Sequence, residues 1–161
     1  QKADALYHIT ERIKKKARQP IIMKLSPNVT DIAEMARAAE AAGADALSLI
    51  NTITGMKIDI HRRCFALANR TGGMSGPAIK PVAVRMVYQA SHAVRIPVIG
   101  MGGIATGEDA IEFILAGATA VSVGAMNFVD PYSTIKVIQG IEDYMRAYNV
   151  EDITDLIGAV V

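Results

Sequence analysis

Tryptophan is absent from the 161-residue sequence, cysteine occurs once, at Cys64, and the other aromatic residues number three Phe and five Tyr. A single cysteine makes neither an internal disulfide nor a cysteine-rich zinc site, which fits a reducing cytoplasm. The shortage of aromatic side chains argues against a base-stacking platform for single-stranded nucleic acid.

Strong charge and long apolar runs are absent as well. The formal net charge is +1, so no long-range field draws the chain to nucleic acid or to an acidic surface. No apolar run approaches the ~20 residues that a membrane span requires, and the N-terminal stretch lacks the apolar core of a signal peptide. Hydrophobic residues make up 51% of the chain, which excludes disorder on composition.

The length of the chain bounds its architecture. A chain of 161 residues can bury one hydrophobic core, whereas a complete (β/α)8 barrel needs ~250 residues. We therefore expect residues 1–161 to be one unit, either a small domain or a piece of a larger one.

Four short apolar runs predict buried strands, at residues 20–25, 46–51, 97–101 and 120–124. Their apolar residues are nearly continuous rather than alternating, as in strands covered on both faces. Helices are predicted around them, at residues 6–17, 30–43, 81–93, 106–117, 133–148 and 152–157. Thr30 and Thr106 are the expected N-caps, with Asp109 completing a capping box, and Gly43 and Gly117 are expected to end their helices.

An internal repeat supports this alternation of strands and helices. Residues 42–49 (AGADALSL) match residues 116–123 (AGATAVSV), and each copy follows a strand and a capped helix. Alternating strands and helices predict a parallel sheet with right-handed crossovers. Four such units are half of a (β/α)8 barrel, although an open parallel sheet is the alternative. Polar residues and glycines follow all four strands, which favours the barrel, because a barrel binds its ligands in those loops.

Two of these strand ends carry side chains suited to binding. Lys24 ends a strand of otherwise apolar residues, so we expect its ammonium either to pair with a carboxylate or to face an anionic ligand or an electron-rich ring. Asn51 and Thr52 follow the next strand, where an Asn amide suits a ligand with imide-like groups or else caps a turn.

Glycines follow the other two strands. Gly102 and Gly103 let the backbone approach an anion, and Gly124 and Ala125 follow the last strand. The helix that begins after the first pair adds the positive end of its dipole. Loops after the last two strands of a (β/α)8 barrel usually form a phosphate site.

The long connection at residues 53–80 is expected to be an active-site loop, and its TGGMSGPA motif at residues 71–78 to contact a cofactor. A flexible, packed loop is the alternative. The histidines His8, His61 and His92 share no ligand spacing, so we interpret them as surface residues. Cys64 has no partner constellation for a nucleophile, so we expect no catalytic role for it.

Five motifs in this order resemble the dihydroorotate dehydrogenase family across essentially the whole chain. They are residues 24–31 (KLSPNVTD), 50–52 (INT), 68–81 (ANRTGGMSGPAIKP), 99–104 (IGMGGI) and 123–128 (VGAMNF). The similarity is strongest to the class 1 type, which uses NAD through a partner subunit carrying FAD and an iron–sulfur cluster. The chain would then be the C-terminal half of an FMN-binding TIM (β/α)8 barrel, with four parallel strands and crossover helices.

The resemblance implies residue roles in the oxidation of dihydroorotate to orotate, a step of pyrimidine (UMP) biosynthesis. Lys24, Ile50 and Gly76 would contact the flavin of FMN, and Asn51 and Thr52 would bind the dihydroorotate or orotate pyrimidine. Gly102, Gly103, Gly124 and Ala125 would hold the FMN phosphate, although the family usually has Thr at position 125.

The resemblance also implies what the chain lacks. The cysteine that removes the C5 proton in the family is expected before Gln1, so we expect no catalytic base here and no turnover by this chain alone. The missing N-terminal half, further copies of the enzyme and the electron-transfer subunit are the expected partners. A dihydropyrimidine dehydrogenase-type flavin domain, a non-catalytic half-barrel that binds FMN or assembles with another chain, and a truncated enzyme are the alternatives.

Overall fold

Four parallel strands form the central sheet of the computed structural model, which describes residues 2–160. The strands are β1 (Ile22–Lys24), β2 (Ala46–Leu49), β7 (Val98–Met101) and β8 (Ala120–Ser122), in the order β1-β2-β7-β8. Every neighbouring pair is parallel. The predicted α/β class and the four parallel strands are confirmed, but each strand is shorter than its apolar run.

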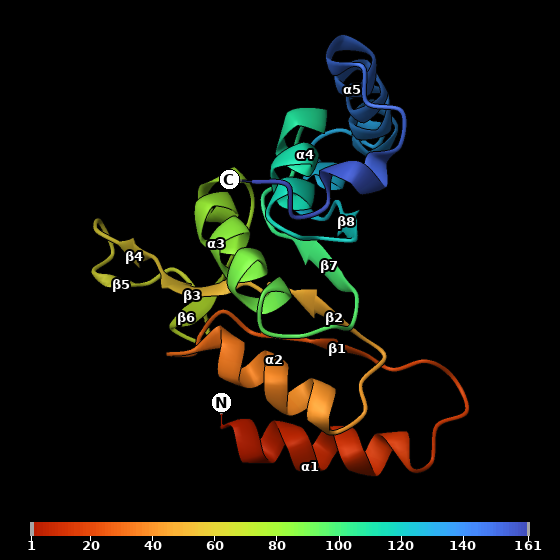
Figure 1. Cartoon of the computed structure of the whole chain (residues 1–161). Helices are drawn as coiled ribbons and strands as arrows, with labels where there is room; N and C mark the ends of the chain where they lie inside the picture. Colours follow the sequence, from red (N-terminus) through yellow and green to blue (C-terminus); the bar gives the residue numbers. More distant parts are fainter. Residues whose placement is uncertain (1, 161) are drawn as a thin grey trace.

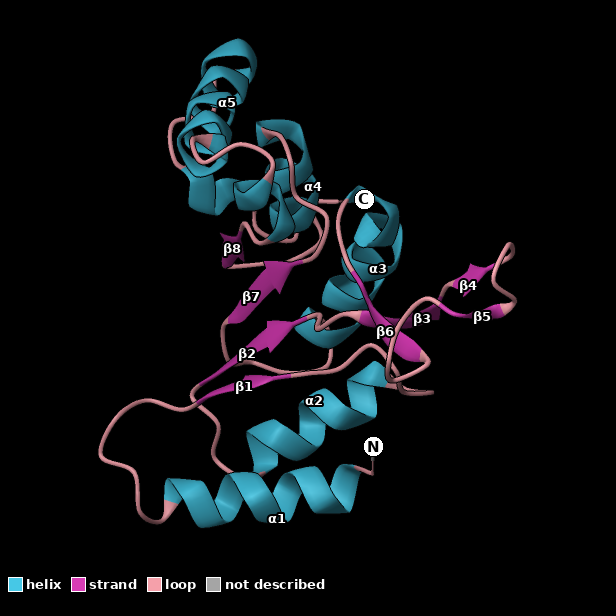
Figure 2. Cartoon of the chain, turned by 180° about the vertical axis from the view of Figure 1, so that it is seen from behind, coloured by secondary structure: helices cyan, strands magenta, loops and turns pink. Residues whose placement is uncertain are grey.

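Between residues 2 and 160, five α-helices accompany this sheet: α1 (Ala3–Lys14), α2 (Ile32–Ala41), α3 (Lys80–Ser91), α4 (Gly107–Leu115) and α5 (Ser133–Tyr148). Figure 2 shows them in an arc around one side of the strands, from α1 at the bottom through α3 to α5 at the top. This is the arrangement of half a (β/α)8 barrel, whose helices lie outside its strands. Within residues 2–160, no helix is both long and apolar enough to cross a membrane.

The hydrophobic core lies between the helices and the strands. Leu47 and Leu49 of β2 and Phe113 of α4 are fully buried there. Burying one such side chain stabilises a fold by about 1.5–3 kcal/mol. Gly100 of β7 lets Phe113 pack on the sheet, because a Cβ at position 100 would lie 2.6 Å from the Cδ1 atom of Phe113.

The two copies of the repeat have the same local structure. Gly43 and Gly117 end α2 and α4 with φ angles of 91° and 106°. The residue after each glycine donates back into the helix, from Ala44 N to Ala39 O at 3.1 Å and from Ala118 N to Phe113 O at 3.0 Å. The left-handed glycine therefore turns each helix directly into the next strand.

Two details of the helices differ from the sequence prediction. The N-cap of α2 is Asp31 rather than Thr30, because the Asp31 carboxylate accepts hydrogen bonds from the amides of residues 33 and 34. Two apolar residues of α1 are exposed although amphipathic helices usually bury such positions, with Ile9 at 55% and Ile13 at 43% of full exposure. Thr10 of α1 is buried instead, and its hydroxyl is satisfied by donating to Leu6 O at 2.8 Å.

The connection between β2 and α3 contains regular structure that the sequence interpretation treated as a loop. Strands β3 (Ile53–Met56) and β6 (Thr71–Met74) pair antiparallel, and β4 (Ile58–Asp59) pairs with β5 (Cys64–Phe65). A 3-10 helix, η1 (Pro77–Ile79), leads from this excursion into α3. Figure 1 shows β4 and β5 projecting away from the rest of the chain. Glycines within β3 and β6 weaken the strand signal in the sequence.

Candidate functional site

A cavity of about 410 Å³ lies where the four parallel strands end. Residues that follow β1, β2, β7 and β8 line it together with the end of the β3–β6 excursion. All nine binding residues suggested by the sequence are part of this lining: Lys24, Ile50, Asn51, Thr52, Gly76, Gly102, Gly103, Gly124 and Ala125. The fold therefore brings together residues that lie up to 101 positions apart (from 24 to 125).

Lys24 is the only charged residue in the described lining of the cavity. It is exposed at the end of β1, and within residues 2–160 no carboxylate lies within ion-pair distance of its ammonium. The ion-paired expectation for this lysine therefore finds no partner in the described part of the chain. An unpaired ammonium beside a cavity free of carboxylates favours an anionic or electron-rich ligand.

The backbone of Ile50 and Asn51 is tied to the neighbouring strands. Ile50 N donates to Met101 O at 2.9 Å, and Asn51 N donates to Leu25 O at 3.0 Å. These bonds continue the pairing beyond the end of β2 on both sides. The two residues therefore enter the cavity from a rigid part of the sheet.

Asn28 fixes the same segment from the loop after β1. Its amide nitrogen donates to Thr52 O at 3.1 Å, and its amide oxygen accepts from Thr54 N at 3.0 Å. The nitrogen also lies 3.2 Å from the hydroxyl of Ser26. One side chain thus uses its donor and its acceptor to join the loop after β1 to the segment after β2. The sequence alone did not indicate this role.

Gly73 of β6 packs against Thr52. A Cβ at position 73 would lie 2.3 Å from the Oγ1 atom and 2.7 Å from the Cβ atom of Thr52. Only glycine therefore leaves room for the Thr52 side chain, and the β3–β6 pair becomes a wall behind it.

Gly76 and Gly124 leave space where a ligand could approach the backbone, whereas a Cβ at Gly102 or Gly103 would meet protein atoms at 3.0 or 2.9 Å. Gly102 and Gly103 have φ angles of 125° and 85°, a region that side-chain-bearing residues rarely adopt. A Cβ at Gly124 or at Gly76 would meet no atom within 4 Å, so that these glycines face open space. These turns fit a phosphate group held close to the backbone.

The start of α4 offers fewer free donors than its sequence suggests. Thr106 and Asp109 form the predicted capping box, with Thr106 Oγ1 accepting from Asp109 N at 3.2 Å. The Asp109 carboxylate accepts from Ala105 N and Thr106 N, both at 2.9 Å. Since these amides are already used, a phosphate would depend on the glycine turns more than on the helix terminus.

Lys80, at the start of α3, reaches across to α4. Its Nζ lies 2.7 Å from Asp109 Oδ1 and 2.5 Å from Glu112 Oε2. The hydrogen bonds to Asp109 and Glu112 raise the pKa of Lys80. Burial acts to raise the pKa of Asp109, but hydrogen bonds from Lys80 and the two loop amides outweigh it, so the pKa is lowered. Both shifts favour the charged pair.

Five further residues line the cavity without having been proposed as binding residues: Ser75, Ile79, Met101, Ser122 and Phe128. Ser75, Ile79, Met101 and Phe128 fall inside the motifs that carry the family resemblance, so the sequence held a signal for them. Ser122 lies outside every motif and ends β8 opposite Met101 of β7 in register. Its place in the lining is a consequence of strand register, which the sequence does not show.

The residues expected to have no catalytic part lie outside this lining. His8, His61, His92 and Cys64 are all exposed, and none contributes to the cavity. The His92 ring instead packs on Tyr88, with ring centroids 4.1 Å apart.

Comparisons with known proteins agree with the motif resemblance. A family model described as dihydroorotate dehydrogenase matches residues 1–145. The chain is 68% identical over 152 residues to a protein of Lachnoclostridium phytofermentans named dihydroorotate dehydrogenase B (NAD(+)), catalytic subunit, covering 94% of the chain and 51% of that relative. Proteins with the same name are 66% identical in Alkaliphilus oremlandii, over 93% of the chain and 50% of the relative, and 54% identical in Geotalea uraniireducens, over 98% and 52%. The chain spans about half the length of these curated relatives.

Proposed function

The chain belongs to the dihydroorotate dehydrogenase family, and from this premise we propose that it is part of an oxidoreductase that converts dihydroorotate to orotate in pyrimidine biosynthesis. One observation carries the proposal. The nine residues that the family motifs assign to flavin and substrate all line a single cavity at the strand ends.

The lining suits FMN as the cofactor. Gly102, Gly103 and Gly124 would bring the backbone close to its phosphate, and Ala125 would contribute an amide but no hydroxyl. Ile50 and Gly76 would lie against the flavin ring. When bound, FMN supplies the hydride acceptor of the reaction.

The polar side chains suit the substrate and its change of charge. Asn51 would offer a donor and an acceptor to the imide-like edge of the pyrimidine, and Thr52 would add a hydroxyl. The ammonium of Lys24 would stabilise negative charge that develops in the ring system during hydride transfer. Asn28 and Gly73 hold Thr52 in place from two sides.

We propose that the proton acceptor of this reaction lies outside this chain. Within the described lining there is no carboxylate, imidazole or thiol, and Cys64 lies on β5, outside the cavity. We therefore place the base on a segment that this chain does not contribute. The chain alone would then bind FMN without turning over dihydroorotate.

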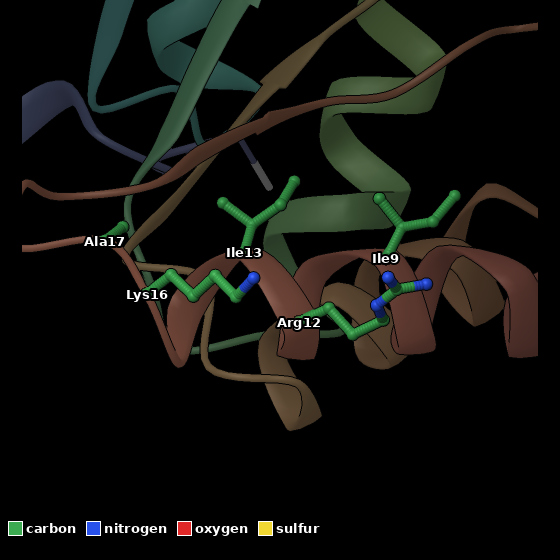
Figure 3. Close-up of a pocket in the computed structure, with 5 residues that line it drawn as sticks. All are labelled: Ile9, Arg12, Ile13, Lys16 and Ala17. Atoms are coloured by element: carbon green, nitrogen blue, oxygen red, sulfur yellow. The ribbon is translucent and has the colours of Figure 1, made fainter.

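The open edges of the sheet suggest where that segment packs. At the β1 edge, Ile22 is 51% exposed, and Figure 3 shows Ile9 and Ile13 projecting from the same face of α1. At the β8 edge, Phe128 is 95% exposed and Ile135 of α5 is 63% exposed. We propose that an N-terminal half-barrel covers both edges and closes the sheet.

Further partners follow from the same family relationship. The relatives are named as catalytic subunits of NAD(+)-linked enzymes. An electron-transfer subunit carrying FAD and an iron–sulfur cluster, self-association and a cytoplasmic location belong to this proposal.

Flavin retention by the purified chain tests the cofactor site. We expect about one FMN per chain, measured from visible absorbance and from the flavin released on denaturation. A chain that folds by circular dichroism but retains no FMN contradicts the cofactor site in this half. Added dihydroorotate should not be oxidised by this chain, and turnover by a chain shown intact by mass would contradict the placement of the base.

Two rival functions have their own tests. A dihydropyrimidine dehydrogenase-type domain would bind uncharged pyrimidines as well as orotate, so a titration with both compounds separates the two enzymes. The exposed edges also favour an assembly module in which two copies close a pseudo-barrel. A dimer that forms without FMN, detected by sedimentation, would support that module.

A further inference from the structure

Lys80 occupies an electrostatically unfavourable place in its own helix. It is the first residue of α3, where the helix dipole is positive and a cation is disfavoured. Its side chain is only 26% exposed. The contacts that stabilise this lysine therefore come from outside α3.

One contact is with the Gly102–Gly103 turn. A Cβ at Gly103 would lie 2.9 Å from Lys80 Cβ, 3.0 Å from Lys80 N and 2.9 Å from Gly76 O. The turn therefore rests directly on the backbone that leads from Gly76 into α3. These are two of the segments that line the cavity.

The second contact is with the far side of the same turn. The Lys80 ammonium binds Asp109 Oδ1, while Asp109 Oδ2 accepts from the amides of Ala105 and Thr106. Glu112 binds the ammonium as well. One carboxylate thus connects α3 to Ala105 and Thr106, the second and third residues after Gly103.

From these contacts, and resting on the proposed flavin function, we propose that Lys80 is a positioning residue for the cofactor phosphate. It clamps the Gly102–Gly103 turn between the Gly76 segment and the start of α4. The clamp holds the turn amides in one arrangement before the phosphate arrives, so that binding does not have to order them. Lys80 itself is absent from the described lining of the cavity.

Lys14 offers a matched control at another place in the fold. Its Nζ lies 2.6 Å from Asp45 Oδ1, Asp45 accepts from Ile21 N at 2.7 Å, and the Lys14 stem packs on Gly43. This pair likewise joins a helix to a glycine turn and a loop amide. It precedes β2, whereas the cavity lies where the strands end.

The test compares Lys80→Met and Lys14→Met in the 161-residue chain, with Lys80→Arg as the charge-preserving variant. Methionine keeps the aliphatic stem and removes the ion pairs. We expect Lys80→Met to raise the dissociation constant of FMN, measured by flavin fluorescence, by about tenfold. The dissociation constants of Lys80→Arg and Lys14→Met should stay within about threefold of that of the unsubstituted chain. Without FMN, hydrogen exchange at residues 102–106 should be faster in Lys80→Met than in Lys14→Met.

The proposal would be overturned if Lys80→Met and Lys14→Met weakened FMN binding equally, in proportion to the stability that each variant loses. If the unsubstituted chain does not bind FMN, the proposed cofactor site fails, and hydrogen exchange alone then decides whether Lys80 orders the turn. If Lys80→Met does not fold, Glu112→Gln takes its place. This variant removes the more exposed of the two carboxylates that bind Lys80, and its FMN affinity and hydrogen exchange are measured in the same way. It should weaken FMN binding by more than the threefold range of the controls, and an affinity and an exchange rate equal to those of Lys14→Met would count against the clamp.

Discussion

The close contact between α4 and α5 predicts that replacing a glycine there by alanine destabilises the fold, although helix propensity alone would predict a gain in stability. Gly107, the first residue of α4, lies against Gly140 inside α5. A Cβ at position 107 would be 2.4 Å from Gly140 C and 2.5 Å from Gly140 Cα. Carbon atoms pack at about 3.5–4.0 Å, so Gly107→Ala requires the helices to separate by roughly 1 Å.

The cost can be set against the gain in helix propensity. Overpacking of this kind costs about 1–3 kcal/mol. Replacing glycine by alanine in a helix gains at most about 1 kcal/mol, and less at the first residue. We expect a net loss of about 1–2 kcal/mol, which lowers the Tm of a chain of this size by roughly 2–8 °C.

Thermal unfolding followed by circular dichroism in one buffer measures this loss. Gly55→Ala is the control, because its Cβ would meet nothing closer than 3.7 Å, and its Tm should not fall. Gly140→Ala should also destabilise, since its Cβ would lie 2.9 Å from Gly107 Cα. The double variant should lose less than the sum of the two, because one separation of the helices relieves both clashes. An unchanged or higher Tm for Gly107→Ala would refute the close approach.

Four further outcomes are expected. Gly73→Ala should weaken orotate binding by about tenfold or more in a calorimetric titration, because a Cβ 2.7 Å from Thr52 Cβ cannot be cleared by rotation of the Thr52 side chain. Gly124→Val should leave the Tm nearly unchanged but reduce FMN retention, since its side chain enters open space at the cavity. Asn28→Asp should lose about 1 kcal/mol in urea unfolding, because the donor to Thr52 O is removed. The folded pKa of Asp109 is lowered, so the stability it contributes is present above its unfolded pKa of about 3.9 and is lost as pH falls through the folded value. The difference in urea stability between the unsubstituted chain and Asp109→Asn should therefore shrink below about pH 4.

Local signals in the sequence determined much of the fold. The α5 bounds match the predicted residues 133–148, and the capping box of Thr106 and Asp109 forms as predicted. The repeat of residues 42–49 and 116–123 reappears as two copies of one helix-to-strand turn. These features depend on interactions within a few residues, so their residue types are sufficient to predict them.

The cavity lining was likewise foreseeable, because parallel strands deliver their last residues to one end of the sheet. Lys24, Asn51, Gly102 and Gly124 could be grouped once the four strands were recognised. The FMN and substrate roles of these residues remain predictions.

Only the tertiary structure decided which distant groups meet. Lys80 and Asp109 are 29 positions apart, and Asn28 reaches Thr54 across 26. The exposure of Ile9 also follows from how α1 packs on the rest of the chain and not from the spacing of apolar residues in α1. Residue spacing along the chain reports which face of an element is apolar, whereas partners and exposure depend on how the elements pack in three dimensions.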